Sequence, residues 1–257
     1  MLSPAPKMKI ETLLSPTELP ALAQRDLRDT ACVVFDILRA TSTFVTALQH
    51  GAQEIIPVSE IAEAVALRRR QPEVLLAGER DGVKIRAAQS GGIDFDFGNS
   101  PREFTPEKVR GKTIVSTTTN GTRALQACAK AKIVLAGSFL NLAATADFLR
   151  GQNDLLLVCA GTGENPAAED ILAAGALIDL LASGKNTHTS KSAHSSAART
   201  SYVQAVLTSL TAAIGNSQNG QRLLANPELR DDVAFCAQRD IFNLVAAMQA
   251  NGSLRKI

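Results

Sequence analysis

Residues 112–125, KTIVSTTTNGTRAL, are the best guide to the fold, because an apolar strand here runs through a polar turn into a helix. Similar strand-to-helix passages occur at residues 31–50, 54–67 and 154–182. Strands that alternate with helices usually form a parallel or mostly parallel sheet covered by helices. We therefore predict an α/β fold with three α/β/α layers, a mostly parallel or mixed sheet, and additional C-terminal helices.

Composition divides the chain into three parts. Residues 1–182 hold the strand–helix alternation, and we expect them to form an α/β core that carries the site. Residues 183–200 are polar and rich in Ser, Thr, Lys and His, which favours a surface loop or a mobile linker. In residues 201–257, apolar side chains recur at helical spacing from Val203 to Met248, so we predict a helical segment packed on the core.

The charge and composition of the 257-residue chain argue against several kinds of partner. The 27 basic and 25 acidic side chains give a net charge of +2, which provides no general attraction to nucleic acid or to an anionic membrane. Aromatic residues make up only 4% of the chain, whereas binding of single-stranded nucleic acid depends on aromatic stacking. No apolar run is long enough to cross a membrane. We therefore expect a small-molecule partner, with no nucleic acid and no membrane.

The four cysteines lie far apart in the sequence and lack the CxxC spacing of metal sites. Unpaired thiols are typical of the cytoplasm, and residues 1–10 lack the apolar segment of a signal peptide. We therefore expect a cytoplasmic protein. Its oligomeric state stays open, because the apolar helix faces fit packing within one chain and packing across a homodimer equally well.

The first candidate site lies at the end of the predicted strand 31–36. Asp36 ends this strand, and Arg39, Ser42 and Thr43 follow it. Ligands of open α/β sheets bind at the carboxyl ends of strands, where a carboxylate suits Mg²⁺ and a guanidinium suits phosphate. A structural ion pair with a helix cap explains the same residues, and the pattern leaves both interpretations open.

A second pair of charges, Glu79 and Arg80, follows the predicted strand 74–79 and lies between glycines. Taken alone, this pair fits an ordinary charged turn better than a site. In the long loop that follows, Asn99 and Ser100 lie in a tight turn, DFGNSP, that would present both side chains inward.

The dense hydroxyl run after residue 115 is the strongest candidate for an anion site. Its polar members are Thr117, Thr118, Thr119, Asn120, Gly121 and Thr122, and Arg123 follows them. Backbone amides at a helix start bind anions, and hydroxyls add donors. An N-cap requires only one such side chain, so the run exceeds what capping needs. It is not a P-loop, because the GxxxxGK[ST] pattern is missing.

Two later strand-to-helix turns are weaker candidates. Ser138 and Asn141 fit a helix cap at least as well as an anion site. Glu169 and Asp170 fall in a first helical turn, where they would either complete a metal site with Asp36 or Glu79 or complement the helix dipole. A catalytic thiol at Cys159 is disfavoured, because Cys-based phosphatase loops place Arg six residues on.

Taken in order, seven segments between residues 31 and 181 resemble the 2-phosphosulfolactate phosphatase family. They are FDILRATST, GAQEIIPV, LLAGERDGVKI, DFGNSP, GKTIVSTTTNGTRAL, LAGSFLN and VCAGTGE…AAEDILAAGALIDLL. The resemblance implies a three-layer α/β/α hydrolase, a phosphoric monoester phosphatase. Such an enzyme uses Mg²⁺ to convert 2-phospho-3-sulfolactate to 3-sulfolactate and phosphate, a step of coenzyme M biosynthesis in some archaea.

This substrate carries about four negative charges, so the site needs concentrated positive potential. As catalytic residues we predict Asp36, Arg39, Glu79, Arg80 and Arg123. As metal ligands we predict Asp36, Glu79, Glu169 and Asp170. The hydroxyls and amides described above would hold the phosphate. Three alternatives stay open: the same chemistry on another phosphorylated hydroxy acid, a non-catalytic anion-binding protein, and a nucleotide-linked oxidoreductase built around Gly161 and Gly163.

Overall fold

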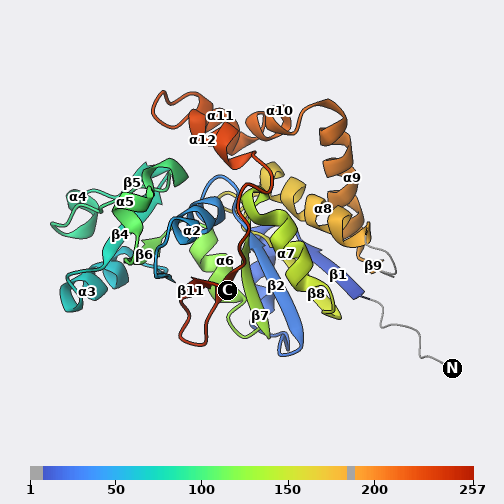
Figure 1. Ribbon diagram of the computed structural model, residues 1–257, viewed down its shortest axis with the longest axis horizontal. Coiled ribbons are helices and arrows are strands. Elements are labelled where there is room, and N and C mark those ends of the chain that lie inside the picture. The colour runs from blue at the N-terminus through green and yellow to red at the C-terminus, as the bar shows by residue number, and fades with distance from the viewer. Residues whose placement is uncertain (1–7, 184–188) are drawn as a thin grey trace.

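The computed structural model describes residues 8–183 and 189–257 (Figure 1). One mixed sheet of eleven strands runs through them in the order β5-β4-β6-β3-β11-β10-β7-β2-β8-β1-β9. The strands are β1 Met8–Leu13, β2 Thr30–Phe35, β3 Glu54–Pro57, β4 Leu75–Arg80, β5 Val83–Lys84, β6 Thr113–Thr117, β7 Ile133–Gly137, β8 Asp154–Cys159, β9 Thr189–Lys191, β10 Ala246–Met248 and β11 Leu254–Lys256.

Helices cover both faces of this sheet, which confirms the predicted three-layer α/β/α fold. The α-helices are α1 Leu19–Leu22, α2 Ala40–Gln49, α3 Ile61–Arg70, α4 Ala87–Ser90, α5 Pro106–Val109, α6 Gly121–Ala127, α7 Leu142–Leu149, α8 Ala168–Ala182, α9 Ala193–Thr208, α10 Leu210–Gly215, α11 Gln218–Leu224 and α12 Asp231–Cys236. Three short 3₁₀ turns, η1 Pro16–Glu18, η2 Pro101–Glu103 and η3 Phe139–Asn141, complete the set.

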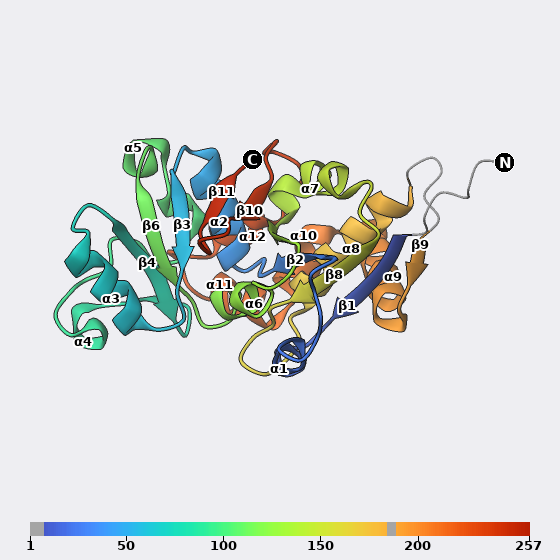
Figure 2. The same ribbon diagram turned by 90° about the horizontal axis from the view of Figure 1, so that it is seen from below.

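The sheet consists of two parallel blocks that run in opposite directions. Strands β4, β6 and β3 form one block, and β7, β2, β8, β1 and β9 form the other. Strands β10 and β11 join them through three antiparallel pairings, and the last pairing matches only Leu254 with Ile55. Figure 2 shows the two blocks on either side of this hairpin.

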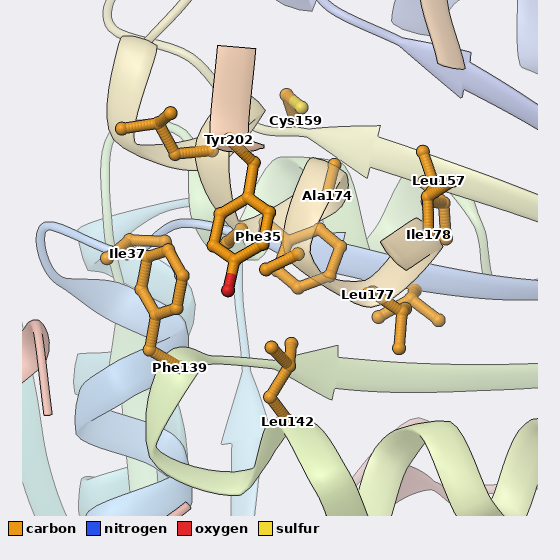
Figure 3. Packing of buried hydrophobic residues seen from close by; sticks show 14 of the residues in the cluster. Phe35, Ile37, Phe139, Leu142, Leu157, Cys159, Ala174, Leu177, Ile178 and Tyr202 are labelled. Atoms are coloured by element: carbon orange, nitrogen blue, oxygen red, sulfur yellow. The ribbon is translucent and has the colours of Figure 1, made fainter. Parts of the chain in front are cut away.

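The central strands are buried on both faces, as parallel strands between helix layers must be. On β2, Val33 and Phe35 belong to the cluster beneath α7 and α8, whereas Cys32 and Val34 face the opposite cluster with α2 and α6. Figure 3 shows Phe35 in the first of these clusters. The alternation holds β2 rigidly, and this fixes the position of the turn that follows it.

The structure differs from the sequence-based prediction at residues 183–200. Residues 189–200 form β9 and the first half of α9 instead of a loop, while residues 184–188 lie outside the described residues. Helix α9 packs closely on α8, where a Cβ atom on Gly175 would lie 2.1 Å from the carbonyl oxygen of Ala198. Small residues that looked like linker composition therefore permit close backbone approach between two helices.

The prediction for residues 201–257 is correct only in its first part. Helices α10, α11 and α12 follow α9, but the last residues form the β10–β11 hairpin inside the sheet. Leu244 and Ala246 face one core cluster, and Val245 and Ala247 face the other. This period of two is typical of a strand, although the spacing of the larger side chains also fits a helix.

Two further expectations concern membrane spans and cysteine pairing. None of the helices in residues 8–183 and 189–257 is both long and apolar enough to span a membrane. Cys32, Cys128, Cys159 and Cys236 are all buried free thiols.

Candidate functional site

Turns from both blocks of the sheet line one cavity of about 300 Å³. The turns after β2 and β8 come from one block, and those after β4 and β6 come from the other. Helix α11 contributes a further wall. The predicted site residues that line the cavity are Asp36, Arg39, Glu79, Asn99, Thr119 and Asn120.

Asp36 is held at the cavity by its own turn. The hydroxyl of Thr41 accepts from the Asp36 N–H at 3.0 Å and donates to the Asp36 carbonyl, while the Ala40 N–H donates to Oδ1 at 3.1 Å. Burial, together with the negative charges of Glu79 and Glu169, raises the pKa of Asp36 to about 7. Burial therefore makes the charged form of Asp36 costly, and the neighbouring acids add to that cost.

Glu79 ties the β4 and β6 turns together with both of its carboxylate oxygens. Oε1 accepts from the backbone N–H of Thr119 at 2.8 Å and from its hydroxyl at 2.9 Å. Oε2 accepts from the Gly82 N–H at 2.7 Å. Glu79 is buried, so these bonds replace the water that it loses on folding.

Asp170 plays a similar part between the β2 and β8 turns. Its Oδ1 accepts from the Ile37 N–H at 2.8 Å, and its Oδ2 accepts from the Gly161 N–H at 3.0 Å. Burial and the charges of Glu169 and Asp36 raise the pKa of Asp170 well above its usual range.

Glu169 differs from Glu79 and Asp170 because one of its oxygens has no partner. Oε1 accepts from Nδ2 of Asn219 at 2.7 Å, but Oε2 is buried without a hydrogen bond to any described residue. Oδ2 of Asp36 accepts no hydrogen bond from the described residues either, since the one bond to this carboxyl reaches Oδ1. A buried carboxylate oxygen without a donor is costly, and a cation would satisfy it.

The predicted set of four metal ligands is thus divided by hydrogen bonding. Among the described residues, no group of three His, Cys, Asp or Glu side chains is arranged to hold a metal ion. Mg²⁺ is often bound by one or two carboxylates plus water. Asp36 and Glu169 fit that smaller set, while Glu79 and Asp170 use their oxygens to hold the backbone of the surrounding turns.

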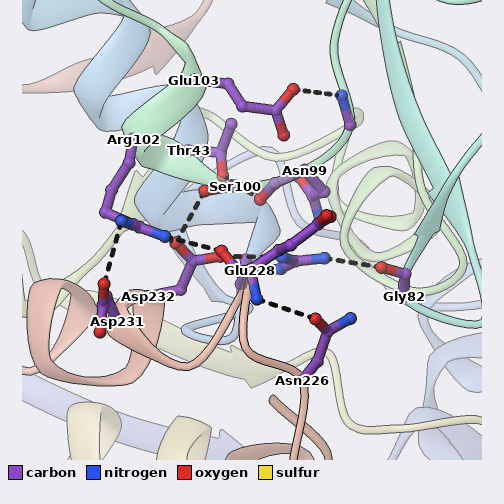
Figure 4. Close-up of polar contacts among 12 residues, drawn as sticks. Thr43, Gly82, Asn99, Ser100, Arg102, Glu103, Asn226, Glu228, Asp231 and Asp232 are labelled. Atoms are coloured by element: carbon purple, nitrogen blue, oxygen red, sulfur yellow. Dashed lines mark hydrogen bonds and ion pairs between the residues drawn. The ribbon is translucent and has the colours of Figure 1, made fainter. Parts of the chain in front are cut away.

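A fully buried ion pair holds Arg39 at the cavity. Nη1 of Arg39 donates to Oδ2 of Asp232 at 2.8 Å, and Nη2 donates to the Gly82 carbonyl at 2.9 Å. Asp232 lies on α12, far from Arg39 in sequence. Figure 4 shows Asp232 at the start of α12, close to Ser100.

Among the residues that the sequence analysis missed, three carry polar groups that line the cavity or hold residues lining it: Asp232, Asn219 and Arg222. All three come from the C-terminal helices, which we expected only to pack on the core. Asn219 donates to Glu169, and Nη2 of Arg222 donates to Oδ1 of Asn219 at 3.0 Å. The available signal was the run QNGQR, in which Asn and Arg stand three apart on one helix face.

Arg80 and Arg123, both predicted as catalytic, do not line this cavity. Arg80 donates to backbone carbonyls of Glu79 and Ser59 and to the hydroxyl of Thr117. Arg123 is exposed and lines a neighbouring cavity of about 670 Å³. The two cavities share Thr119, Asn120 and Gly163 as a wall.

Most of the other predicted phosphate-binding residues are buried behind the cavity. Their polar groups bond to the protein: Ser42 to Ser138, Thr43 to the Asn99 carbonyl, Ser100 to Asp232, Thr117 to the Ser59 carbonyl, Thr118 to Thr122, and Asn141 to Ser138 and the Leu244 carbonyl. These contacts match the capping and turn roles that the sequence left open.

Asn120 and Gly121 hold the turns around the cavity together. The Asn120 side chain donates to the carbonyls of Ala160 and Gly163, joining the β6 and β8 turns. A Cβ atom on Gly121 would lie 2.6 Å from both Oδ2 of Asp36 and Cβ of Ala40. Only glycine allows α6 to approach the β2 turn this closely.

Cys159 is buried in the core and does not line the cavity. Burial and the charge of Asp170 raise the pKa of its thiol well above the usual range. A reactive thiolate would need the opposite environment.

Comparison with known proteins identifies the same family over most of the chain. The sequence profile described as 2-phosphosulpholactate phosphatase matches residues 17–251. A protein of Thermotoga maritima named probable 2-phosphosulfolactate phosphatase is 40% identical over 216 residues, which cover 84% of this chain and 88% of the relative. Relatives of the same name from Carboxydothermus hydrogenoformans and Clostridium novyi are 39% identical over 93% of this chain and 92% of the relative, and 33% identical over 93% and 96%.

Proposed function

The chain belongs to the 2-phosphosulpholactate phosphatase family, and we propose that it hydrolyses 2-phospho-3-sulfolactate to 3-sulfolactate and phosphate with the help of Mg²⁺. One observation carries the proposal. The cavity is lined by the carboxyl group of Asp36 and the guanidinium groups of Arg39 and Arg222. Behind it, Glu169 bonds to the lining residue Asn219 and keeps one buried oxygen without a partner among the described residues. Such a set suits an anion together with a divalent cation.

Asp36 and Glu169 would hold the metal in this scheme. Mg²⁺ bound there would neutralise phosphoryl charge and lower the pKa of a bound water. The raised pKa of Asp36 fits this assignment, because burial and the nearby charges of Glu79 and Glu169 disfavour its charged form, and a bound cation would favour that form.

Arg39 and Arg222 would bind the anionic groups of the substrate. Arg39 has five N–H donors, and the protein engages two of the guanidinium nitrogens through Asp232 and Gly82. Arg222 has no carboxylate partner among the described residues, and its one side-chain bond goes to Asn219. Arg222 is therefore the cation of the cavity whose charge is least compensated.

Water is the favoured nucleophile. Ser116 and Thr118 carry hydroxyls that could act as nucleophiles, but both residues are buried and do not line the cavity. The Thr119 hydroxyl does line it, but it donates to Glu79 at 2.9 Å. Direct attack by water needs no displacement of these bonds.

A nucleotide-linked oxidoreductase has little support, because Asp179, the acid near the spacing that ribose binding requires, forms an ion pair with Arg199. Another phosphorylated hydroxy acid is the alternative substrate, because the cavity would recognise the same anionic groups. Cytoplasmic location and a homodimer also stay predictions, and the four buried free thiols support the first.

The proposal is tested by measuring phosphate release from 2-phospho-3-sulfolactate and from a panel of simple phosphate esters. We expect hydrolysis with Mg²⁺, loss of activity in EDTA, and recovery when excess Mg²⁺ is added. Full activity in EDTA would reject the metal. Tight binding of the ester without turnover, measured by calorimetry, would identify an anion-binding protein instead.

A further inference from the structure

We propose that Asp232 on α12 is a positioning residue of the phosphatase site and acts through Arg39. The inference rests on the proposed function, because it assigns Arg39 to the phosphate. It also gives the C-terminal helices a role in the reaction, whereas the sequence predicted that the site belongs to residues 1–182.

The environment of Asp232 is built around its carboxylate. Asp232 is 0% exposed. Oδ2 accepts from Nη1 of Arg39 at 2.8 Å, while Oδ1 accepts from the Ser100 hydroxyl at 2.7 Å and from Nε of Arg102 at 2.9 Å. Figure 4 shows Asp232 with Ser100 and Arg102 grouped around it. Three donors from two segments thus fix the orientation of one carboxylate.

Arg39 connects this carboxylate to the catalytic turns. Its second terminal nitrogen donates to the Gly82 carbonyl, and the Gly82 N–H donates to Glu79. The planar guanidinium is therefore fixed at both ends, by α12 on one side and by the turn after β4 on the other. A group held at two nitrogens keeps its remaining donors in one direction, and Arg39 lines the cavity.

Charge gives Asp232 a second effect on the site. The side chain of Arg39 is only 3% exposed, so water cannot replace the carboxylate if it is removed. The other carboxylates that line the cavity are Asp36, Glu79 and Asp81, and the first two would hold the metal or its surrounding turns. Without Asp232, an uncompensated Arg39 would turn toward them and leave the position in which it meets the phosphate.

A double-mutant cycle tests the proposal in the full chain with Mg²⁺. We expect Asp232→Asn to lower kcat/KM about 10²-fold, the scale of loss when a reacting group is misplaced by about 1 Å. In the Arg39→Ala background the same change should alter kcat/KM by no more than about two- to threefold, because Asp232 then has no Arg39 guanidinium to position. A purely structural role would give equal losses in both backgrounds, and that result would overturn the proposal.

Asp179→Asn is the matched control, because Asp179 forms an ion pair with Arg199 between α8 and α9. It makes the same chemical change away from the cavity and should leave kcat and KM unchanged. Thermal unfolding of all variants shows which of them are folded.

If Asp232→Asn does not fold, the pair Arg39→Met and Arg39→Met/Asp232→Leu replaces it. Apolar replacement of both partners of a buried ion pair is often tolerated. Equal kcat and KM in these two variants supports the proposal, and a further loss in the double variant overturns it.

Binding of inorganic phosphate, measured by calorimetry, separates this inference from the proposed function. If the wild type binds phosphate but hydrolyses no ester, the proposed function fails. The double-mutant cycle is then measured as the phosphate affinity of each variant instead of its kcat/KM. Asp232→Asn should then weaken binding only when Arg39 is present. A wild type that neither binds phosphate nor releases it overturns both proposals.

Discussion

Asp36 and Gly121 belong to different blocks of the sheet, yet the absence of a side chain at Gly121 lets α6 begin against the Asp36 carboxylate. Asp36 thereby becomes buried, and burial is the main cause of its raised pKa. The acids around the cavity differ in how their carboxylate oxygens are bonded. Glu79 and Asp170 accept backbone N–H groups with both oxygens, whereas Glu169 keeps one oxygen without a partner.

At the scale of single residues, we predict that Arg222→Ala raises KM and lowers kcat/KM. Loss of one hydrogen bond to a charged group costs about 1.5–3 kcal/mol. Arg230→Ala is the control, because Arg230 is an exposed residue near α11 that does not line the cavity. Steady-state kinetics of Arg222→Ala and Arg123→Ala, measured side by side, decide which of the two arginines binds the substrate. A larger loss for Arg123→Ala would restore the sequence-based choice.

At the scale of elements, the β10–β11 hairpin joins two blocks that would otherwise share no strand pairing. It lies between β3 and β7, although it comes from the last residues of the chain. The turns that line the cavity come from both blocks, so this hairpin helps to set the distance between Glu79 and Asp36.

We predict that Leu254→Ala on β11 lowers the free energy of unfolding by about 2–5 kcal/mol, because Leu254 is fully buried and large-to-small changes in a core leave a cavity. Ile257→Ala removes a similar side chain that is 57% exposed, and it should change stability by no more than about 0.5 kcal/mol. Urea unfolding measures both. Similar values for the two variants would show that the hairpin does not hold the blocks together.

At the scale of the whole molecule, charge is balanced overall but not locally. A net charge of +2 is spread over 257 residues, while Asp36, Glu79, Glu169 and Asp170 are buried near one another. The raised pKa values of Asp36 and Asp170 mean that the folded, metal-free protein binds protons at pH values where the unfolded chain has released them.

We therefore predict that metal-free protein loses stability as the pH rises from about 4 to above 7. The pKa of Asp36 changes from 3.8 to about 7 on folding. The stability that Asp36 contributes is therefore fully present below pH 3.8 and is lost as the pH rises through about 7. The total loss from this group is about 4 kcal/mol at most. Thermal unfolding from pH 5 to 8 checks this.

Asp36→Asn provides the internal comparison for that experiment. Its melting temperature should fall less between pH 5 and 8 than that of the wild type, and Mg²⁺ should stabilise the wild type but not the variant at pH 8. Equal stabilisation of both by Mg²⁺ would place the metal elsewhere.

By itself, the sequence determined the α/β layers and the polar turns after β2, β4, β6 and β8, because hydrophobic periodicity and strand-end side chains are local features. It also determined the family, through seven segments in register. Only the tertiary structure decided which side chains share the cavity. Asn219 and Arg222 line it, and Asp232 holds Arg39 there, because α11 and α12 fold back over the sheet. Arg80 and Arg123 lie outside it, because Arg80 is bonded to carbonyls of Glu79 and Ser59 and Arg123 lines the neighbouring cavity. Such pairings depend on packing between residues far apart in the chain, which no local pattern records.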